Sequence, residues 1–307
     1  MAEAATIRTL SLAEVETLVA WAAGEGWNPG LRDAAAFHAA DPQGFLGAFV
    51  EGRMAAGISA VDYGGFGFIG LYICRPDMRG RGYGRAVWDA GMARLAQTTV
   101  GLDGVPAQQA NYRSMGFAPA YRTFRFSGRL LAAVLSAEVH PVEPDLLPAL
   151  GEFDRRFFPA ARPSFLEGWL APPNIALAKI GEGGIQGYGV VRECREGFKI
   201  GPLFAVDEIA AADLLAALMR SARAKSKSTC RRTRKISPIF FCGQDFRGAL
   251  KQRACIAARL PNWTDRAYSA SRRWSSARTT AVATMEHAGP EGRNRLQHPF
   301  DFPRNPG

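Results

Sequence analysis

The order of apolar and polar residues over positions 5–128 predicts short strands separated by helices. Thr6–Leu10 has the composition of a strand, and the capping box Ser11-Leu12-Ala13-Glu14 opens an amphipathic helix that ends near Ala23. A second helix is predicted over residues 31–40. Residues 44–50 and 53–63 predict a hairpin whose turn, Glu51-Gly52, carries the glycine.

The next segment combines a strand, a glycine-rich loop and a helix. The apolar run 68–74 leads through residues 75–78 into Arg79-Gly80-Arg81-Gly82-Tyr83-Gly84-Arg85, and residues 86–97 favour a helix. Glycines at alternate positions let the backbone approach a ligand, and the first N–H groups of a helix point outward at its positive end. This arrangement favours phosphate binding, although a tight strand-to-helix turn would use the same glycines.

The loop lacks the hallmarks of two common phosphate-binding motifs. A Walker loop requires Gly-Lys-Ser/Thr, whereas Gly84 is followed by Arg85 and Ala86. A dinucleotide fingerprint requires a small residue where Arg85 lies. The pattern Arg-x-x-Gly-x-Gly, formed by Arg79, Gly82 and Gly84, resembles the coenzyme A pyrophosphate loop of the GNAT superfamily of N-acetyltransferases.

A second motif follows a short β-rich run at residues 98–102. Tyr112, in a predicted helix, precedes Gly116-Phe117 in the pattern Tyr-x-x-x-Gly-Phe, which resembles the second GNAT signature. In that superfamily the tyrosine protonates the departing thiolate, and a phenol suits this role because it stays protonated at neutral pH. A helix tyrosine packed on the sheet, with Gly116 as a C-cap, is the structural alternative.

With a late strand over residues 121–126, the element order resembles that of the GNAT fold from residue 5 to about 128. The resemblance implies an α/β (α+β) protein with a mixed, mostly antiparallel sheet flanked by helices. Gly26-Trp27-Asn28-Pro29-Gly30 further resembles a bacterial GNAT subgroup that carries a second, GNAT-like carboxy-terminal domain.

The resemblance also implies an activity: acetyl-CoA would donate its acetyl group to a primary amine of a small molecule by direct attack. The pantetheine arm would lie beside the strand Ile69–Cys74, and a nearby backbone N–H would stabilise the oxyanion. The amine must arrive deprotonated, and approximation of the two reactants supplies much of the rate enhancement. The expected coenzyme-binding residues are Leu71, Tyr72, Ile73, Arg79, Gly80, Arg81, Gly82, Tyr83, Gly84 and Arg85.

The general base is not evident. Many GNAT members carry a glutamate on the central strand, and residues 66–74 contain no carboxylate. Asp62 and Asp103, at the ends of neighbouring strands, are the candidates beside Tyr112 for the catalytic residues, although each also fits a turn or capping role. Relay through water is a further route. Cys74 fits inert packing, and the four histidines show no ligand spacing, so we expect no metal.

The chain predicts three segments: a GNAT N-acetyltransferase domain over 1–128, an incomplete GNAT-like domain over 129–225, and a basic, poorly ordered tail over 226–307. The second segment echoes the first in Gly197–Phe204 and the helix from Asp207, with Ala205-Val206-Asp207-Glu208 in place of the arginine-glycine loop. Two acids there would repel pyrophosphate, so we expect no coenzyme in this segment. The resemblance to two-domain members implies that this second segment forms one side of the acceptor site. The aromatic residues that could line it, or could be plain core, are Phe157, Phe158, Phe165 and Trp169.

The net positive charge of the chain comes entirely from the tail. Residues 226–307 contain 16 Lys/Arg and 5 Asp/Glu, a net charge of +11, whereas the whole chain carries +10. Clustered arginines could bind nucleic acid, but no recognition module is evident and we do not expect this partner. We favour the hypothesis that the tail is out of frame. Suitable codons for residues 267–277, shifted by one frame, spell Leu-Phe-Gly-Val-Thr-Ser-Leu-Glu-Leu-Gly, which resembles the usual end of this subgroup.

The general features suit an intracellular enzyme. An apolar content of 47% supplies buried cores for two domains. No apolar run of membrane-spanning length and no signal-peptide pattern occur, so we expect a soluble, cytoplasmic monomer or homodimer without a membrane partner. Five scattered cysteines fit a reducing compartment. The alternative to an N-acetyltransferase is a non-catalytic acyl-CoA-binding or basic nucleic-acid-binding protein.

Overall fold

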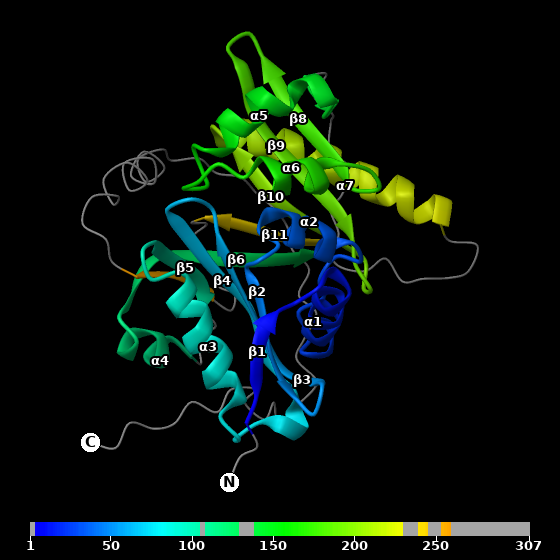
Figure 1. Cartoon of the computed structure of the whole chain (residues 1–307). Coiled ribbons are helices and arrows are strands. Elements are labelled where there is room, and N and C mark those ends of the chain that lie inside the picture. The colour runs from blue at the N-terminus through cyan, green and yellow to red at the C-terminus, as the bar shows by residue number, and fades with distance from the viewer. Residues whose placement is uncertain (1–3, 105–107, 129–137, 230–238, 245–252, 259–307) are drawn as a thin grey trace.

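One twelve-stranded mixed sheet runs through both halves of the chain in the order β1-β2-β3-β4-β5-β12-β6-β11-β10-β9-β8-β7 (Figure 1). The computed structural model describes residues 4–104, 108–128, 138–229, 239–244 and 253–258. Among the strands of these described ranges, only β4–β5 and β10–β11 pair in parallel, so the sheet is mostly antiparallel. The strands are β1 (Thr6–Thr9), β2 (Phe45–Val50), β3 (Arg53–Asp62), β4 (Phe66–Cys74), β5 (Thr99–Gly104), β6 (Phe117–Gly128), β7 (Val139–Pro141), β8 (Ile175–Gly181), β9 (Gly184–Glu193), β10 (Phe198–Ala205), β11 (Ile239–Gln244) and β12 (Arg253–Ala258).

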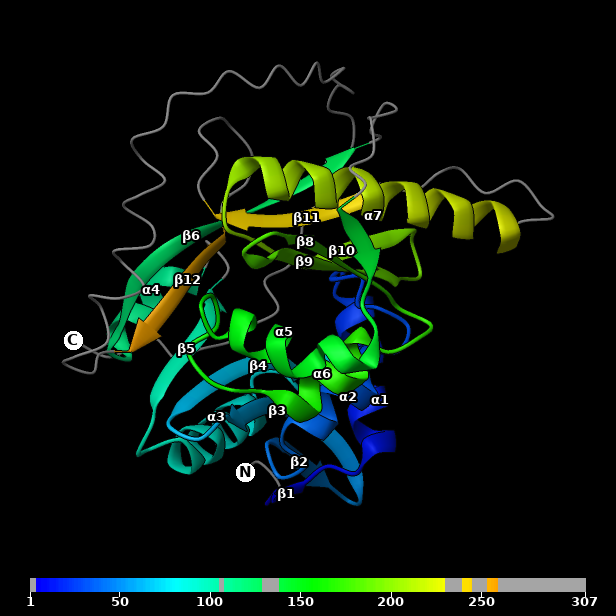
Figure 2. The ribbon, with the colours of Figure 1, turned by 90° about the horizontal axis from the view of Figure 1, so that it is seen from above.

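Helices cover both faces of the sheet in the amino-terminal half (Figure 1). Helices α3 and α4 pack against one face of β2–β5, and α1 and α2 pack against the other face. In the second half, α7 covers one face of β8–β10, while α5 and α6 cover the other (Figure 2). The helices are α1 (Leu12–Gly24), α2 (Asp33–Ala40), α3 (Tyr83–Arg94), α4 (Gln109–Ser114), α5 (Leu147–Asp154), α6 (Pro163–Leu170) and α7 (Glu208–Thr229), with single 3₁₀ turns at Pro76–Met78 and Pro144–Leu146.

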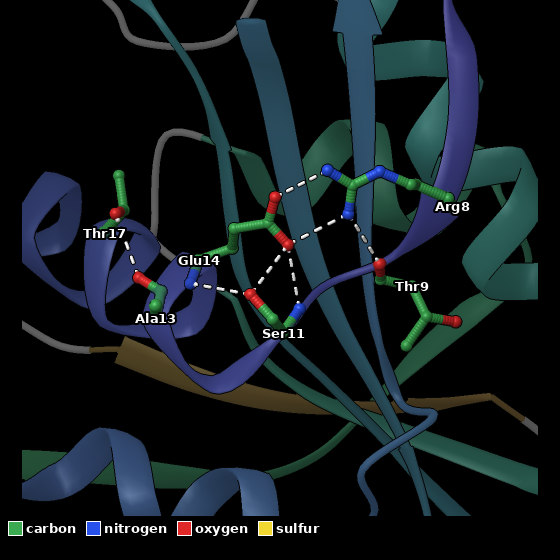
Figure 3. Close-up of polar contacts among 6 residues, drawn as sticks. All are labelled: Arg8, Thr9, Ser11, Ala13, Glu14 and Thr17. Atoms are coloured by element: carbon green, nitrogen blue, oxygen red, sulfur yellow. Dashed lines mark hydrogen bonds and ion pairs between the residues drawn. The ribbon is translucent and has the colours of Figure 1, made fainter. Parts of the chain in front are cut away.

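The predicted capping box sets the start of α1 (Figure 3). The Glu14 N–H donates to the Ser11 hydroxyl, and the Glu14 carboxylate accepts the Ser11 N–H at 2.8 Å. Arg8, on β1, donates to the same carboxylate at 2.9 Å. Because this carboxylate accepts the Arg8 hydrogen bonds, and also those of Ser11, the pKa of Glu14 is lowered to about 2. One side chain thereby fixes the strand-to-helix connection.

The two halves meet along a seam formed by residues 27–33 and the β9–β10 hairpin. Asn28 exchanges hydrogen bonds with the backbone of Glu196, at 2.9 and 3.2 Å. The Lys199 ammonium donates to the carbonyl oxygens of Trp27 and Asn28, at 2.6 and 2.7 Å. The Gly-Trp-Asn-Pro-Gly motif of the sequence therefore serves as a docking segment between the two halves.

A buried ion pair reinforces this seam. Asp33, at the start of α2, accepts hydrogen bonds from the Arg192 guanidinium on β9 and from the Gly30 N–H. The two side chains are only 5% and 10% exposed. Arg192 also stacks on Trp169 of α6, 4.1 Å from the ring centroid. Both charges are thus removed from water and depend on each other.

Most of the predicted elements are present, with shifts at their ends. Helix α3 begins at Tyr83 rather than residue 86, and α7 continues to Thr229 instead of ending near Met219. Within 226–307, the described residues form the end of α7 and the strands β11 and β12, which the sequence did not predict. The other residues of that segment lie outside the described ranges, so the domain boundaries and the out-of-frame hypothesis stay predictions. Among the described residues, no helix combines the length and apolarity needed to span a membrane.

Candidate active site

The candidate site lies where β4 and β5 separate. The parallel register joins Phe66 to Thr99 and ends with Ile69 opposite Leu102. On its other side β5 pairs with β12 from Gly101 to Gly104, while β4 continues past Ile69 to Cys74 beside β3. Parallel neighbours that part in mid-strand leave a split in which an extended ligand can lie against the edge of β4. We call this region the β4–β5 split.

A bulge shapes β4 at the split. Its pairing with β3 passes from Gly70 opposite Ser59 to Ile73 opposite Gly57, so Leu71 and Tyr72 together face one residue of β3. Leu71 takes a left-handed conformation with φ of 44°, which is uncommon for a residue with a side chain. The extra residue changes the side-chain alternation: Ile69 and Tyr72 both join the core beneath α3, whereas Ile73 joins the core beneath α1.

The arginine-glycine loop ends at the amino terminus of α3, where an anion can approach the first N–H groups of the helix. Gly82, with φ of 85°, is the N-cap of α3, and glycine has no side chain to occupy the first N–H groups of the helix. Gly80 is also left-handed, with φ of 73°. The first turn contains no acidic residue, and Arg81 and Arg85 are exposed beside it. The backbone and the charges therefore fit the diphosphate of a coenzyme A ester.

Arg79 has a structural role in this loop. Its guanidinium donates to Glu25 after α1 at 2.6 Å and to the carbonyl oxygen of Cys74 at 3.1 Å. Both side chains of the ion pair are 20% exposed. These contacts tie the loop to the end of β4 and to α1. Arg85 pairs with Asp89 one turn along α3, at 2.7 Å.

Gly84 packs closely against Tyr72. A Cβ atom at this position would lie 3.0 Å from the Tyr72 hydroxyl oxygen, so a side chain would force that phenol to move. Tyr72 in turn contacts Trp88, with ring centroids 5.4 Å apart. Burial raises the pKa of the Tyr72 phenol. Tyr72 thus links the bulge in β4 to the first turn of α3.

Tyr112 lies on α4 in the same aromatic cluster. Its ring stacks on Trp88 at 6.0 Å and contacts Phe117 at 6.1 Å. Burial raises the pKa of Tyr112 to about 12, because a phenolate would lose its hydration there. The Tyr112 phenol therefore stays protonated throughout the physiological range.

The structure separates the two candidate carboxylates. Asp62 lies opposite Gly67, at the other end of β4 from the bulge, and its carboxylate accepts the Gly64 N–H at 2.8 Å. It therefore holds the β3–β4 turn and is not brought close to Leu71. Asp103 is exposed on β5, one residue beyond the last β4–β5 pair, and so lies at the split.

Asp103 also lies on the face of the sheet opposite α3. Its neighbour Leu102 is in the core beneath α3, and side chains alternate along a strand. Consistent with this, a Cβ atom on Gly101 would point toward the rings of Phe66 and Phe68. The arginine-glycine loop and Asp103 thus lie on opposite faces of the sheet at the split.

Aromatic side chains from both halves of the chain meet on that same face at the start of β4, three residues before the last β4–β5 pair. Phe158, in the α5–α6 connection, contacts Tyr63 and Phe66 edge to face, at 5.0 and 5.7 Å between ring centroids. Of the other three aromatics expected near an acceptor site, Phe165 and Trp169 are buried and stack on Phe37 of α2, and Phe157 stacks on Phe204 at 4.8 Å. No signal in the sequence distinguished Phe158 from these core residues, because the pairing is long-range. A group of three side chains able to hold a metal ion is absent from the residues described.

Comparison with known proteins identifies two related domains. The acetyltransferase (GNAT) family matches residues 12–121, and an acetyltransferase (GNAT) domain matches residues 150–239. The chain is 30% identical over 207 residues to a holothin acyltransferase from a Pseudoalteromonas species, a match that spans 66% of this chain and 70% of the relative.

Two solved structures have the same fold. An acetyltransferase from Pyrococcus horikoshii superposes with a TM-score of 0.63 at 18% identity, over 82% of this chain and 88% of that one. A tandem GNAT protein of clavulanic acid biosynthesis gives 0.56 at 12% identity, over 83% of this chain and 98% of that one. With the split strands and the glycine-capped helix, these likenesses confirm the fold class that the sequence predicted. The chain belongs to the GNAT acetyltransferase superfamily as a two-domain member, an acyltransferase that uses acyl-CoA.

Proposed function

We propose that this chain transfers the acetyl group of acetyl-CoA to a primary amine of a small molecule. The observation that carries the proposal is the combination of the β4–β5 split with the glycine-capped start of α3. The two features are neighbours along the chain, because α3 follows β4 after one 3₁₀ turn. The split suits an extended pantetheine arm and the helix start suits a diphosphate. The relative whose name states that it acylates holothin supports a small-molecule acceptor.

The residues of the site suggest how the transfer proceeds. The amine nitrogen attacks the thioester carbonyl carbon, and a backbone N–H in the bulge, near Leu71 to Ile73, stabilises the oxyanion. As the C–S bond breaks, Tyr112 donates its proton to the leaving thiolate. Asp103, directly or through water, receives the proton that the amine loses. The thiolate leaves with the electron pair of the C–S bond, and because the amine itself displaces it, no covalent enzyme intermediate is needed.

Donor binding is tested by calorimetry with acetyl-CoA and two matched variants. Gly82→Ala and Gly52→Ala each place a Cβ atom on a left-handed glycine, with φ of 85° and 75°, and neither atom meets a neighbour within 4 Å. The backbone strain is therefore similar, but only Gly82 starts α3. We expect Gly82→Ala to weaken acetyl-CoA binding and Gly52→Ala to leave it unchanged. Equal affinities in the two variants would refute the donor site.

Catalysis is tested by release of free thiol from acetyl-CoA with a panel of amines. Removing a positioned acid or base typically costs about 10²–10⁴-fold in rate. We expect Tyr112→Phe to lower kcat within this range with little change in acetyl-CoA affinity, and Asp103→Asn to slow turnover. Asp62→Asn is the control carboxylate, since it holds only a turn. No thiol release with any amine, despite acetyl-CoA binding, would favour a non-catalytic acyl-CoA-binding protein.

A further inference from the structure

The mechanism proposed above leaves one buried hydroxyl unused. Ser59, on β3, is only 7% exposed, yet its hydroxyl has no hydrogen-bond partner among the described residues. A buried hydroxyl without a partner destabilises a fold, so its presence requires another explanation. The other buried polar side chains in the described ranges have partners: Asp33 with Arg192, Asp154 with Arg162, Lys179 with Asp213, and Gln108 with Asn111.

Ser59 lies beside the bulge of β4, on the face of the sheet opposite α3. It pairs with Gly70, the residue immediately before the bulge. Its neighbours Ile58 and Ala60 belong to the core beneath α3, and side chains alternate along a strand, so Ser59 points to the other face. Gly70 is one residue past Ile69, where the β4–β5 pairing ends. The hydroxyl is therefore one strand away from the β4–β5 split.

The space over Gly70 is open. A Cβ atom there would lie 3.0 Å from the Ser59 oxygen, and apart from the adjoining residues no other described atom lies within 4 Å of it. On the same face, a Cβ atom on Gly57 or Gly101 would lie 2.8 Å from a neighbouring side chain. The Ser59 oxygen is not sealed in, because Arg192 Nε is the side-chain atom of the described residues that is fully buried without a partner. We call this space the Gly70 gap.

We propose that the acceptor nitrogen occupies the Gly70 gap and that the Ser59 hydroxyl accepts a hydrogen bond from it. This inference rests on the proposed function and adds the residue that orients the nucleophile. One N–H of the neutral amine donates to Ser59 Oγ, which directs the nitrogen lone pair toward the thioester carbon at the bulge. As the N–C bond forms, the thiolate leaves with the C–S electron pair. The hydroxyl is too weak a base to keep the proton of the amine, which leaves by the route proposed above.

The test measures thiol release with hydroxylamine, a small nitrogen nucleophile, and with each amine of the panel that the wild-type protein accepts. Ser59→Ala should lower kcat/KM for the acceptor roughly 2- to 12-fold, the factor that matches one hydrogen bond, with acetyl-CoA affinity unchanged in calorimetry. Gly70→Ala, which fills the Gly70 gap, should raise KM for the acceptor. Ser221→Ala is the matched control and should leave kcat/KM unchanged, because the Ser221 hydroxyl donates to the Ala217 carbonyl within α7 at 3.0 Å.

Thermal melting separates this role from a structural one. A serine that holds the fold together would lower Tm when it is replaced, whereas Ser59→Ala removes a hydroxyl without a partner in the described structure and should leave Tm unchanged or higher. A lower Tm for Ser59→Ala, or a kcat/KM equal to that of Ser221→Ala, would overturn the role of Ser59 and leave the proposed function standing. No thiol release with hydroxylamine or any amine of the panel would overturn both.

Discussion

The buried ion pair between Asp33 and Arg192 should dominate the stability of the seam between the two halves. Asp33→Asn keeps the size of the side chain but removes its charge, which leaves the Arg192 guanidinium buried without a counter-ion. Both side chains are at most 10% exposed, so solvent cannot replace the lost partner. Breaking such a buried pair typically costs about 3–5 kcal/mol. The Gly30 N–H, which donates to Asp33 at 2.8 Å, loses a charged acceptor at the same time.

The measurement is urea unfolding at neutral pH, supported by thermal melting. For a chain of this size, about 1 kcal/mol shifts Tm by roughly 2–4 °C, so we expect Asp33→Asn to lower Tm by roughly 6–20 °C. The control is Asp89→Asn, which breaks the pair with Arg85 at the surface, where the side chains are 54% and 56% exposed. Exposed pairs of this kind contribute about 0.5 kcal/mol or less.

A double-mutant cycle separates the pair from its surroundings. Arg192→Met removes the guanidinium but also its stacking on Trp169. If the two charges depend on each other, Arg192→Met combined with Asp33→Asn should be more stable than the sum of the single effects predicts, by about 1 kcal/mol or more. Additivity within about 0.5 kcal/mol, or a loss for Asp33→Asn no larger than that of the surface control, would refute the reasoning.

Three further predictions concern other parts of the chain. The pKa of Glu14 is lowered to about 2 in the folded protein, so its stabilisation is present above its ordinary pKa and is lost as pH falls toward 2; urea midpoints of Glu14→Gln should therefore fall less steeply than wild type between pH 4.5 and 2. Asp154→Asn should destabilise the second half by about 3 kcal/mol or more, because Arg162 stays buried, and an unchanged melting curve would contradict this. Resequencing the gene across codons 219–230 should reveal a single-base length error if the tail is out of frame; an intact frame there excludes that hypothesis.

Local signals made the strand, the loop and the helix of the proposed donor site predictable. The strand, the loop and the helix from Phe66 to Arg94 follow one another without interruption, and the capping box at Ser11 lies within four residues. The start of α3 was placed three residues late, because Gly82 caps the helix in a left-handed conformation and lets Tyr83 and Gly84 join its first turn. Glycine in a loop and glycine before a helix give the same signal in a sequence.

The features that sequence reasoning missed all depend on long-range contacts. Asp33 and Arg192 meet across 159 residues, and Phe158 of the second half contacts Tyr63 of the first half. The bulge at Leu71 leaves no compositional trace, because its strain is set by pairing with β3. Asp62 and Asp103 were equivalent candidates until the register showed which one lies at the split.

The donor side that we propose for this site consists largely of main-chain groups, at the bulge of β4 and at the first turn of α3. Main-chain N–H groups remain when most side chains are replaced. A thioester-binding site built from them can therefore persist while the rest of a sequence changes. The opposite face is built from the rings and carboxylates of individual residues, each of which one codon change can alter. A chain and its relative at 30% identity can therefore inherit a common donor yet evolve toward separate acceptors.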